Sequence, residues 1–393
     1  MEKNMTPVPH ASPASASGAP FAATPQAYDA ILLAGFGGPE GQDDVIPFLR
    51  NVTRGRGIPD ERLEEVATHY RHFDGVSPIN AQNRALKAAL ETELAARRID
   101  LPVYWGNRNW EPYLSDAIRE AADSGRTRLL ALATSAYSSF SSCRQYREDF
   151  ARVLEETDLA GTVTIDKIRQ FFDHPGFVDS FVDSVVEALT GFSDEGVSGE
   201  TMRVLFTTHS IPMTDAERSG PRDRGFGPGG AYEAQHLAVG AEVMRRVAAR
   251  DHRFADVAWE LVYQSRSGPA SQPWLEPDIC DRIAQLPGEG VGAIAISPIG
   301  FVSDHMEVLW DLDTEALEAA AEVGIRAVRT ATPGADPVFV RGIVDLVEER
   351  IAAVEPERRP SATTLGPWFD VCRAGCCENV RAGFKPAAAG VAP

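Results

Sequence analysis

The sequence has few of the features that mark membrane proteins or nucleic-acid-binding proteins. No part of the 393-residue chain approaches the roughly 20 consecutive apolar residues that a membrane-spanning helix requires. Positive charge is also scarce, because 38 Lys and Arg residues stand against 57 Asp and Glu residues, for a formal net charge of −19. Nucleic acids and anionic lipid surfaces are bound by clustered Lys and Arg. We therefore expect a soluble protein with no membrane span and no nucleic-acid partner.

An export signal and a nucleotide-binding loop are missing as well. Residues 1–27 are rich in Ala, Pro and Ser and lack the basic start and apolar stretch of a secretory signal. They are predicted to be a disordered leader, and the protein is expected to be cytoplasmic. The segment Gly35-Phe36-Gly37-Gly38-Pro39 differs from a dinucleotide loop, because the third glycine would fall at Glu40. Nucleotide chemistry is therefore disfavoured.

Cysteine is rare, but its distribution is uneven. Cys143 follows a Ser-rich segment, and Cys372, Cys376 and Cys377 lie close together near the carboxyl terminus. A disulfide framework is not expected without export. Four thiolates could instead hold a [2Fe–2S] cluster or a structural zinc ion, and the spacing alone leaves both open. Cys280 lies on a helical pattern and is interpreted as an ordinary, partly buried cysteine.

Between the two ends, apolar strand-like segments alternate with amphipathic helical segments. This alternation predicts an α/β fold with parallel sheets covered by helices on both faces. The length favours two domains, which we place at residues 28–170 and 171–335. A helix at 336–355 and a linker with a cysteine-rich tail at 356–393 complete the chain. Predicted strands are Ala30–Ala34, Pro102–Gly106, Arg128–Thr134, Arg203–Thr207, Ala258–Tyr263 and Gly292–Ser297. Predicted helices are Asp60–Arg71, Ala81–Arg97, Pro112–Ser124, Arg144–Glu156, Pro175–Leu189, Tyr232–Arg250 and Pro337–Ala353.

Two groups of residues near the ends of predicted strands carry chemistry. His209 directly follows the strand 203–207, where ligands of open α/β sheets bind. An imidazole there could accept a proton or bind a transition metal, although a structural histidine is an equally good interpretation. Glu307, Asp311 and Glu315 recur at intervals of four and would share one helix face. A solvated acidic face is the simple alternative, but apolar neighbours favour a carboxylate row that relays protons or metal ions.

The loop Thr-Arg-Gly-Arg-Gly-Ile-Pro contains the basic residues best placed to bind an anion. Arg54 and Arg56 alternate with glycines in this loop. From spacing alone, a solvated turn is the better interpretation. An anionic substrate would nevertheless need such a patch to overcome the general negative charge.

Taken together, these segments resemble the ferrochelatases, particularly their actinobacterial, coproporphyrin-using branch. The resemblance covers about residues 28–355. Its most specific part is Pro298 to Glu307, combined with His209. The matching segments are Phe36–Pro39, Arg54–Arg56, Gly75–Ile79, Ser135–Tyr146, Thr208–Pro212, Tyr263–Arg266 and Pro298–Glu307.

The resemblance implies two Rossmann-like domains, of the chelatase-like fold, with a porphyrin cleft between them. It assigns the iron site to His209 and Glu307 and places porphyrin contacts at Ser77 and Tyr146. Phe36 stands where some bacterial relatives have a tyrosine that can bind the porphyrin metal, so here it can only pack against the ring. The resemblance also implies a [2Fe–2S] cluster held by the four cysteines named above.

The expected activity is insertion of ferrous iron into a porphyrin during haem biosynthesis. Coproporphyrin III is the expected substrate, with Fe-coproporphyrin III as product. The alternatives are a protoporphyrin IX ferrochelatase, a chelatase inserting cobalt or nickel into a sirohydrochlorin-like ring, and a non-catalytic porphyrin or haem carrier. The resemblance favours a monomer, and a haem-pathway enzyme that receives the product is the partner we expect.

Overall fold

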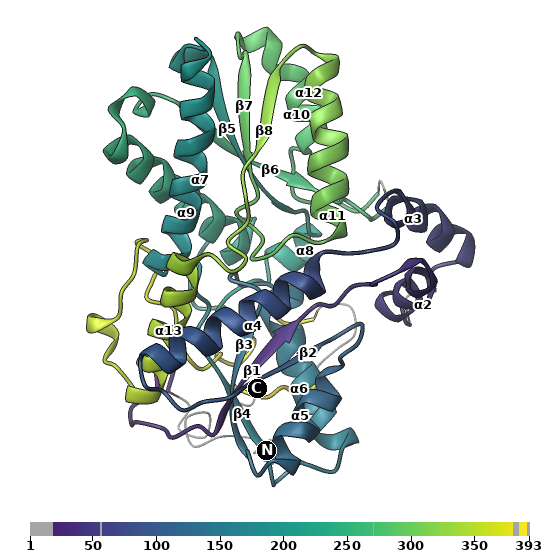
Figure 1. Ribbon diagram of the computed structural model, residues 1–393, viewed down its shortest axis with the longest axis vertical. Coiled ribbons are helices and arrows are strands. Elements are labelled where there is room, and N and C mark those ends of the chain that lie inside the picture. Colours follow the sequence, from purple (N-terminus) through teal and green to yellow (C-terminus); the bar gives the residue numbers. More distant parts are fainter. Residues whose placement is uncertain (1–18, 56, 270, 380–384, 391–393) are drawn as a thin grey trace.

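The computed structural model describes residues 19–55, 57–269, 271–379 and 385–390 and contains two parallel four-stranded sheets (Figure 1). The first sheet has the order β2-β1-β3-β4 and the second the order β6-β5-β7-β8, so both halves share one topology. This confirms the predicted α/β class. The first sheet consists of β1 (Ala30–Gly35), β2 (Val103–Asn107), β3 (Arg128–Ala133) and β4 (Thr164–Lys167). The second consists of β5 (Met202–His209), β6 (Ala258–Gln264), β7 (Ala293–Ser297) and β8 (Arg326–Arg329).

The central strands form because they are continuously apolar. Every residue of β1 is buried, as is every residue of β7, which fits sheets covered by helices on both faces. The sequence patterns missed β4 and β8, which are four residues each. Both carry charged side chains, such as Lys167 and Arg329, and therefore lack the apolar run that identifies the central strands.

Helices of the first half pack around its sheet, except for one pair that projects from it. In Figure 1, α2 and α3 form a hairpin at the right, away from the body of the molecule. The sequence patterns did not predict α2, because Pro47 lies inside it. The helices are α2 (Gln42–Val52), α3 (Asp60–His72), α4 (Ile79–Ala96), α5 (Leu114–Asp123), the π-helix η1 (Phe140–Arg144) and α6 (Gln145–Glu156).

In the second half, the helical segment after Asp304 differs from the expected regular α-helix. Three residues of α-helix lead into the π-helix η5 (Leu309–Ala316), whose i→i+5 hydrogen bonds are rare in proteins. The α-helices are α7 (Pro175–Asp194), α8 (Met213–Ala216), α9 (Gly230–Arg250), α10 (Ile279–Gln285), α11 (Met306–Val308) and α12 (Leu317–Glu322). Short 3₁₀ turns cover Gly199–Thr201, His252–Phe254, Leu286–Glu289 and Pro356–Arg358.

The last long helix, α13 (Pro337–Ala352), lies against α4 of the first half (Figure 1). The Arg97 guanidinium at the end of α4 donates to the carboxylates of Asp345 and Glu348 on α13, the latter over 2.7 Å. The chain thus returns from the second sheet to the first.

Among the described residues, no helix is long and apolar enough to cross a membrane.

Both flanking segments are more ordered than the composition suggested, as far as they are described. Residues 1–18 of the expected leader lie outside the described residues, but residues 19–27 pack against the carboxyl-terminal part of the chain. The Ala22 N–H donates to Asp370 over 2.9 Å. In the expected linker, Arg359 is buried and forms two 2.8 Å hydrogen bonds with Asp370. This buried ion pair and the fully buried ring of Trp368 anchor the tail.

Candidate active site

His209 is the last residue of β5, the strand between β6 and β7. Its neighbour across the β5–β6 register is Gln264. The loop after β7 passes close to the strand: a Cβ on Gly300 would lie 2.1 Å from the Thr208 hydroxyl, so only glycine fits there. His209 therefore lies at the carboxyl edge of the sheet, where the sequence predicted it.

The structure brings His209 and Glu307 together. The Nε2 atom of His209 lies 3.6 Å from the Oε2 atom of Glu307, and the two side chains are 34% and 52% exposed. The other ring nitrogen, Nδ1, makes a short hydrogen bond to the main-chain carbonyl of Ser210. Because a carbonyl only accepts, Nδ1 is the donor in this hydrogen bond, and Nε2 is the ring nitrogen that faces the Glu307 carboxylate. This pair can accept protons or bind a divalent metal ion from a common space.

Asp311 lies on η5, partly buried behind Glu307. It accepts hydrogen bonds from the Ser265 hydroxyl and from the Gln264 amide, the latter over 3.2 Å. Burial is the main cause that raises the pKa of Asp311 to about 7, and the Glu307 charge adds to it. Asp311 can thus gain or lose a proton near neutral pH.

Glu315 ends the acidic row in an exposed position. Its carboxylate accepts a 2.9 Å hydrogen bond from the indole of Trp310. The row therefore runs from the exposed Glu307 through the partly buried Asp311 to Glu315 at the surface. The sequence predicted the row, but not the π-helical geometry that carries its last two members.

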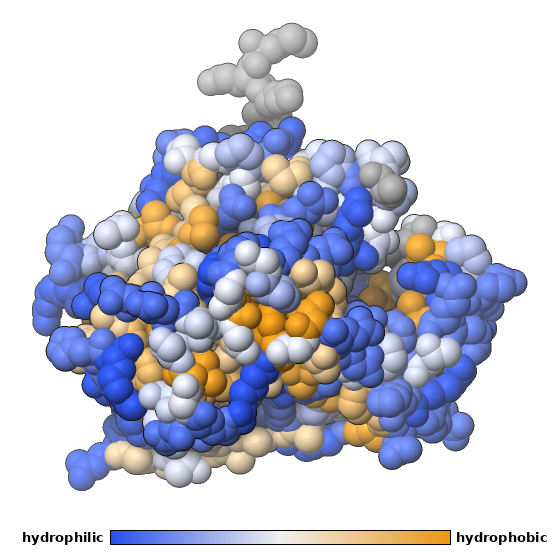
Figure 2. Space-filling view, turned by 90° about the horizontal axis from the view of Figure 1, so that it is seen from above, coloured by the Kyte–Doolittle hydropathy of each residue, from blue (hydrophilic) through white to orange (hydrophobic). Residues whose placement is uncertain are grey.

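Trp310 also connects the site to the projecting hairpin. Its ring stacks on His69 of α3, with 4.1 Å between ring centroids and 6° between ring planes. In addition, Met306 is part of the apolar cluster inside the α2–α3 hairpin. Sequence patterns gave no sign of this contact, because residues some 240 positions apart meet only in the folded chain. Figure 2 shows the lobe at the right separated from the body by a recess with apolar surface around it; this lobe occupies the place of the hairpin in Figure 1.

Phe36 and Ser77 lie near one another beside this hairpin. Phe36 is 38% exposed, with its ring edge-on to Phe48 of α2 at 6.4 Å between centroids. Ser77 is buried, and the main chain of Gly38 lies directly against it: a Cβ on Gly38 would be 2.7 Å from the Cβ of Ser77. The exposed Phe36 ring leaves a flat apolar surface beside the hairpin.

The remaining predicted porphyrin contacts are less clearly placed. Arg54 is exposed at the end of α2, where it donates to Asn51. Arg56 lies outside the described residues. Tyr146 is only 4% exposed, packed in the core of the first half under the guanidinium of Arg108. Its contact with porphyrin stays a prediction that this packing does not favour.

Comparison with known proteins identifies the family. The family model described as "Ferrochelatase" matches residues 28–351. The chain belongs to the ferrochelatase family. It is 66% identical over 391 residues to a protein of Leifsonia xyli named coproporphyrin III ferrochelatase, covering 98% of this chain and 99% of that one. Proteins of the same name from Tropheryma whipplei and Streptomyces griseus are 54% and 53% identical, covering 97% and 93% of this chain and 96% and 97% of theirs.

In this member of the ferrochelatase family, four cysteines that are distant in sequence meet in the interior. Cys143, Cys372, Cys376 and Cys377 are all at most 4% exposed. The Sγ atom of Cys377 lies 3.8 Å from those of both Cys143 and Cys376, and Cys372 is within hydrogen-bonding reach of Cys143 and Cys376. S–H donation from Cys143, followed by that from Cys376, holds the pKa of Cys372 well below its usual value. Cys280 lies apart on α10 and is partly buried, as expected.

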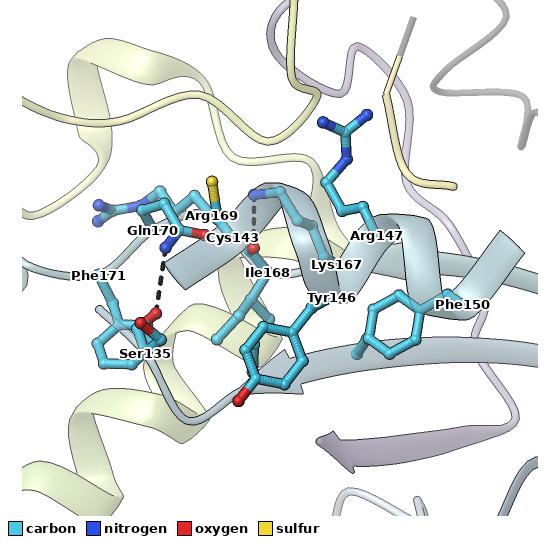
Figure 3. A pocket seen from close by; sticks show the side chains of 12 residues that line it. Ser135, Cys143, Tyr146, Arg147, Phe150, Lys167, Ile168, Arg169, Gln170 and Phe171 are labelled. Atoms are coloured by element: carbon cyan, nitrogen blue, oxygen red, sulfur yellow. Dashed lines mark hydrogen bonds between the residues drawn. The ribbon is translucent and has the colours of Figure 1, made fainter. Parts of the chain in front are cut away.

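The surroundings of the four sulfurs are rich in positive charge. Figure 3 shows Cys143 in a small cavity that is also lined by Arg147 and Lys167. Both cations are buried, and within the described chain Nη1 of Arg147 has no hydrogen-bond partner. The Gly220 N–H donates to the sulfur of Cys377 over 3.1 Å. Among the described residues, no three His, Cys, Asp or Glu side chains are arranged to hold one metal ion.

Proposed function

We propose that this chain inserts ferrous iron into coproporphyrin III and releases Fe-coproporphyrin III for haem biosynthesis. The observation that carries the proposal is the facing pair of His209 and Glu307, 3.6 Å apart, in a member of the ferrochelatase family. Relatives that are 53–66% identical along nearly their whole length bear the name coproporphyrin III ferrochelatase, which supports this substrate.

Metallation replaces the two inner N–H protons of the porphyrin by Fe²⁺ and leaves two protons to be removed. The Nε2 atom of His209 is placed to accept the first pyrrole proton, with the Glu307 carboxylate as second acceptor or as ligand for the incoming iron. Asp311, with its pKa raised to about 7, receives protons from this pair, and Glu315 passes them to solvent. The acidic row therefore connects the reacting nitrogens with the surface.

The macrocycle is proposed to lie in the recess beside the α2–α3 hairpin. Phe36 packs against the ring face, and Ser77 and Tyr146 are carried over as further contacts from the family resemblance. The exposed Arg54 pairs with the porphyrin carboxylates at the solvent edge. Arg56, the second basic residue predicted for this role, lies outside the described residues. Phe36 has no metal-binding atom, so any axial ligand on that side comes from another group.

We also propose that Cys143, Cys372, Cys376 and Cys377 hold a [2Fe–2S] cluster. Four converging, buried sulfurs fit this group, and the nearby cations and the Gly220 N–H would offset its negative charge. Since a cluster of two irons takes two protein sulfurs at each iron, it does not need three side chains around one ion, as a mononuclear zinc site would. A bound cluster would supply a one-electron redox centre and would cross-link the tail to η1, the π-helix that contains Cys143.

Three further expectations accompany the proposal. The chain acts as a monomer in the cytoplasm and hands its product to a haem-pathway enzyme.

The two nearest alternatives are insertion of iron into protoporphyrin IX and carriage of porphyrin without turnover. A carrier would explain a recess lined by apolar residues, but not a proton-accepting pair with an acidic row behind it.

Initial rates with the two porphyrins test the substrate. Under anaerobic conditions with Fe²⁺, we expect kcat/KM for coproporphyrin III to exceed that for protoporphyrin IX at least tenfold. Equal values would contradict the substrate choice, and binding of both porphyrins without metallation would favour the carrier.

For the cluster, anaerobically purified protein should absorb visible light and contain iron and acid-labile sulfide. Colourless protein with zinc or no metal would contradict it.

A further inference from the structure

The main chain at the proposed catalytic histidine is held by Tyr232, at the start of α9. The phenol of Tyr232 donates a 2.9 Å hydrogen bond to the main-chain carbonyl of His209. Its oxygen also lies 2.7 Å from the Thr208 hydroxyl. Burial raises the pKa of Tyr232 far above the physiological range, so its O–H stays a donor. The carbonyl of the next residue, Ser210, orients the His209 ring. Tyr232 thus fixes the peptide from which the imidazole is aimed.

Tyr232 is in turn held by the segment that contacts the cysteines. Its main-chain N–H donates to the Ser219 hydroxyl over 2.8 Å, and that hydroxyl donates to the Ala216 carbonyl over 2.6 Å. The next residue, Gly220, donates its N–H to the sulfur of Cys377 over 3.1 Å. A continuous series of contacts therefore runs from Cys377 to His209.

This series is tightly packed rather than loosely connected. Ser219 and Tyr232 are each 4% exposed, and Thr208 is fully buried. Gly220 has φ +78°, and a Cβ there would lie 2.4 Å from that of Ala231. A Cβ on Gly230 would lie 1.8 Å from the Ala216 carbonyl oxygen. Because neither close approach tolerates a side chain, displacement of one link must move its neighbours.

We propose that Tyr232 is a positioning residue for His209 and that Ser219 and Gly220 couple it to the cluster-binding Cys377. Cluster assembly would then order the segment Ala216–Tyr232 and hold the imidazole in its productive orientation. The inference rests on the proposed function, since it concerns the same histidine and the same cysteines. Tyr232 touches neither substrate in this role and acts only through the His209 peptide.

The first test removes the hydroxyl alone, with the variant Tyr232→Phe. We expect a roughly five- to tenfold lower kcat for metallation of coproporphyrin III, because one hydrogen bond to the positioning peptide is lost. KM for the porphyrin should change less than about twofold, and visible absorption of the cluster should be unchanged. The matched control is Tyr28→Phe, which deletes a partly buried hydroxyl that donates over 3.0 Å to Asp166 in the other half. It should keep the parental kcat.

The second test examines the link to the cysteines. Ser219→Ala removes the acceptor of the Tyr232 N–H and leaves all four cysteines in place, so it should lower kcat as much as Tyr232→Phe. The double variant should lose little more than either single variant, because both cut one series of contacts. Multiplicative losses would overturn the coupling.

Hydrogen–deuterium exchange gives a readout that does not depend on activity. In Cys377→Ala, amides of peptides covering residues 213–232 should exchange about tenfold faster than in the cluster-loaded parent, whereas those of β1 should not change. If Cys377→Ala does not fold, Ser219→Ala in the cluster-loaded protein serves the same comparison. Unchanged exchange in residues 213–232 would overturn the coupling.

The outcomes separate this inference from the proposed function. A parent protein that does not metallate porphyrin contradicts the proposed function. An active parent whose kcat survives Tyr232→Phe within twofold overturns the positioning role. An active but colourless parent overturns the link to a cluster.

Discussion

Replacing His209 with alanine should separate catalysis from folding. The side chain is 34% exposed and makes one hydrogen bond, to the Ser210 carbonyl, so its removal should cost about 1 kcal/mol of the free energy of unfolding. That is small beside the roughly 5–15 kcal/mol typical of folded proteins, and Tm should fall by only about 2–4 °C. Loss of a positioned proton acceptor lowers kcat by about 10²–10⁴-fold. Activity should therefore almost vanish in a protein that is still folded.

The assay follows the disappearance of porphyrin absorption in anaerobic solution with Fe²⁺, at saturating coproporphyrin III. The matched control is His252→Ala, which removes an exposed imidazole from a turn and should keep the parental rate. Glu307→Gln should lower kcat in the same range as His209→Ala, since it removes the facing carboxylate 3.6 Å away. A folded His209→Ala protein that metallates within tenfold of the parent would refute the assignment of His209.

Three further predictions concern groups with shifted pKa values. The Asp311 carboxyl has its pKa raised to about 7, so its ionisation destabilises the folded state as pH rises through 7. The variant Asp311→Asn should therefore raise Tm at pH 8 but not at pH 4. It should also lower kcat about tenfold. An unchanged Tm at pH 8 would show that Asp311 ionises freely. Cys372→Ala should lose visible absorption and acid-labile sulfide, and retention of both would exclude this residue as a ligand. Burial lowers the pKa of His174 to about 4 despite the exposed Asp345 carboxylate 3.9 Å away, so the folded state resists its protonation. The full free energy of unfolding is therefore present above pH 6.5, where His174 is neutral in the folded and unfolded states. It decreases as pH falls toward 4, by about 2 kcal/mol at pH 5. His174→Asn keeps an acceptor for the Gly176 N–H, and its free energy of unfolding should depend less on pH between 7.5 and 5. Denaturant titrations giving equal pH dependence would contradict it.

Much of the fold could be predicted from sequence because its signals are local. The apolar runs of β1, β3, β5 and β7 identify buried strands directly, and the apolar residues of β6 identify a partly buried one. The amphipathic pattern of α9 identifies a covering helix. β4 and β8 could not be found in this way, because they lie at sheet edges and their charged side chains are paired through contacts with distant segments, as Arg329 is with Asp304 and Asp313.

The candidate site divides in the same way. His209 could be placed because it ends an apolar strand, and Glu307 because a specific segment surrounds it; their separation of 3.6 Å could not, since it depends on how β5 and the loop after β7 pack. The π-helix of η5 was missed because its residues do not differ in pattern from those of an α-helix. Gln264 and Ser265 were visible at a strand end, but nothing local links them to Asp311.

The sequence by itself therefore determined the α/β class, the central strands, the family and the chemical types of the site residues, because each depends on periodicity or on a contiguous motif. Only the tertiary structure decided which of those residues meet. It brings Cys143 to Cys377 across 234 positions and Tyr232 to the carbonyl of His209 across 23. It also stacks His69 on Trp310. Such contacts arise because close packing of distant segments, rather than local preference, fixes the neighbours of each buried side chain.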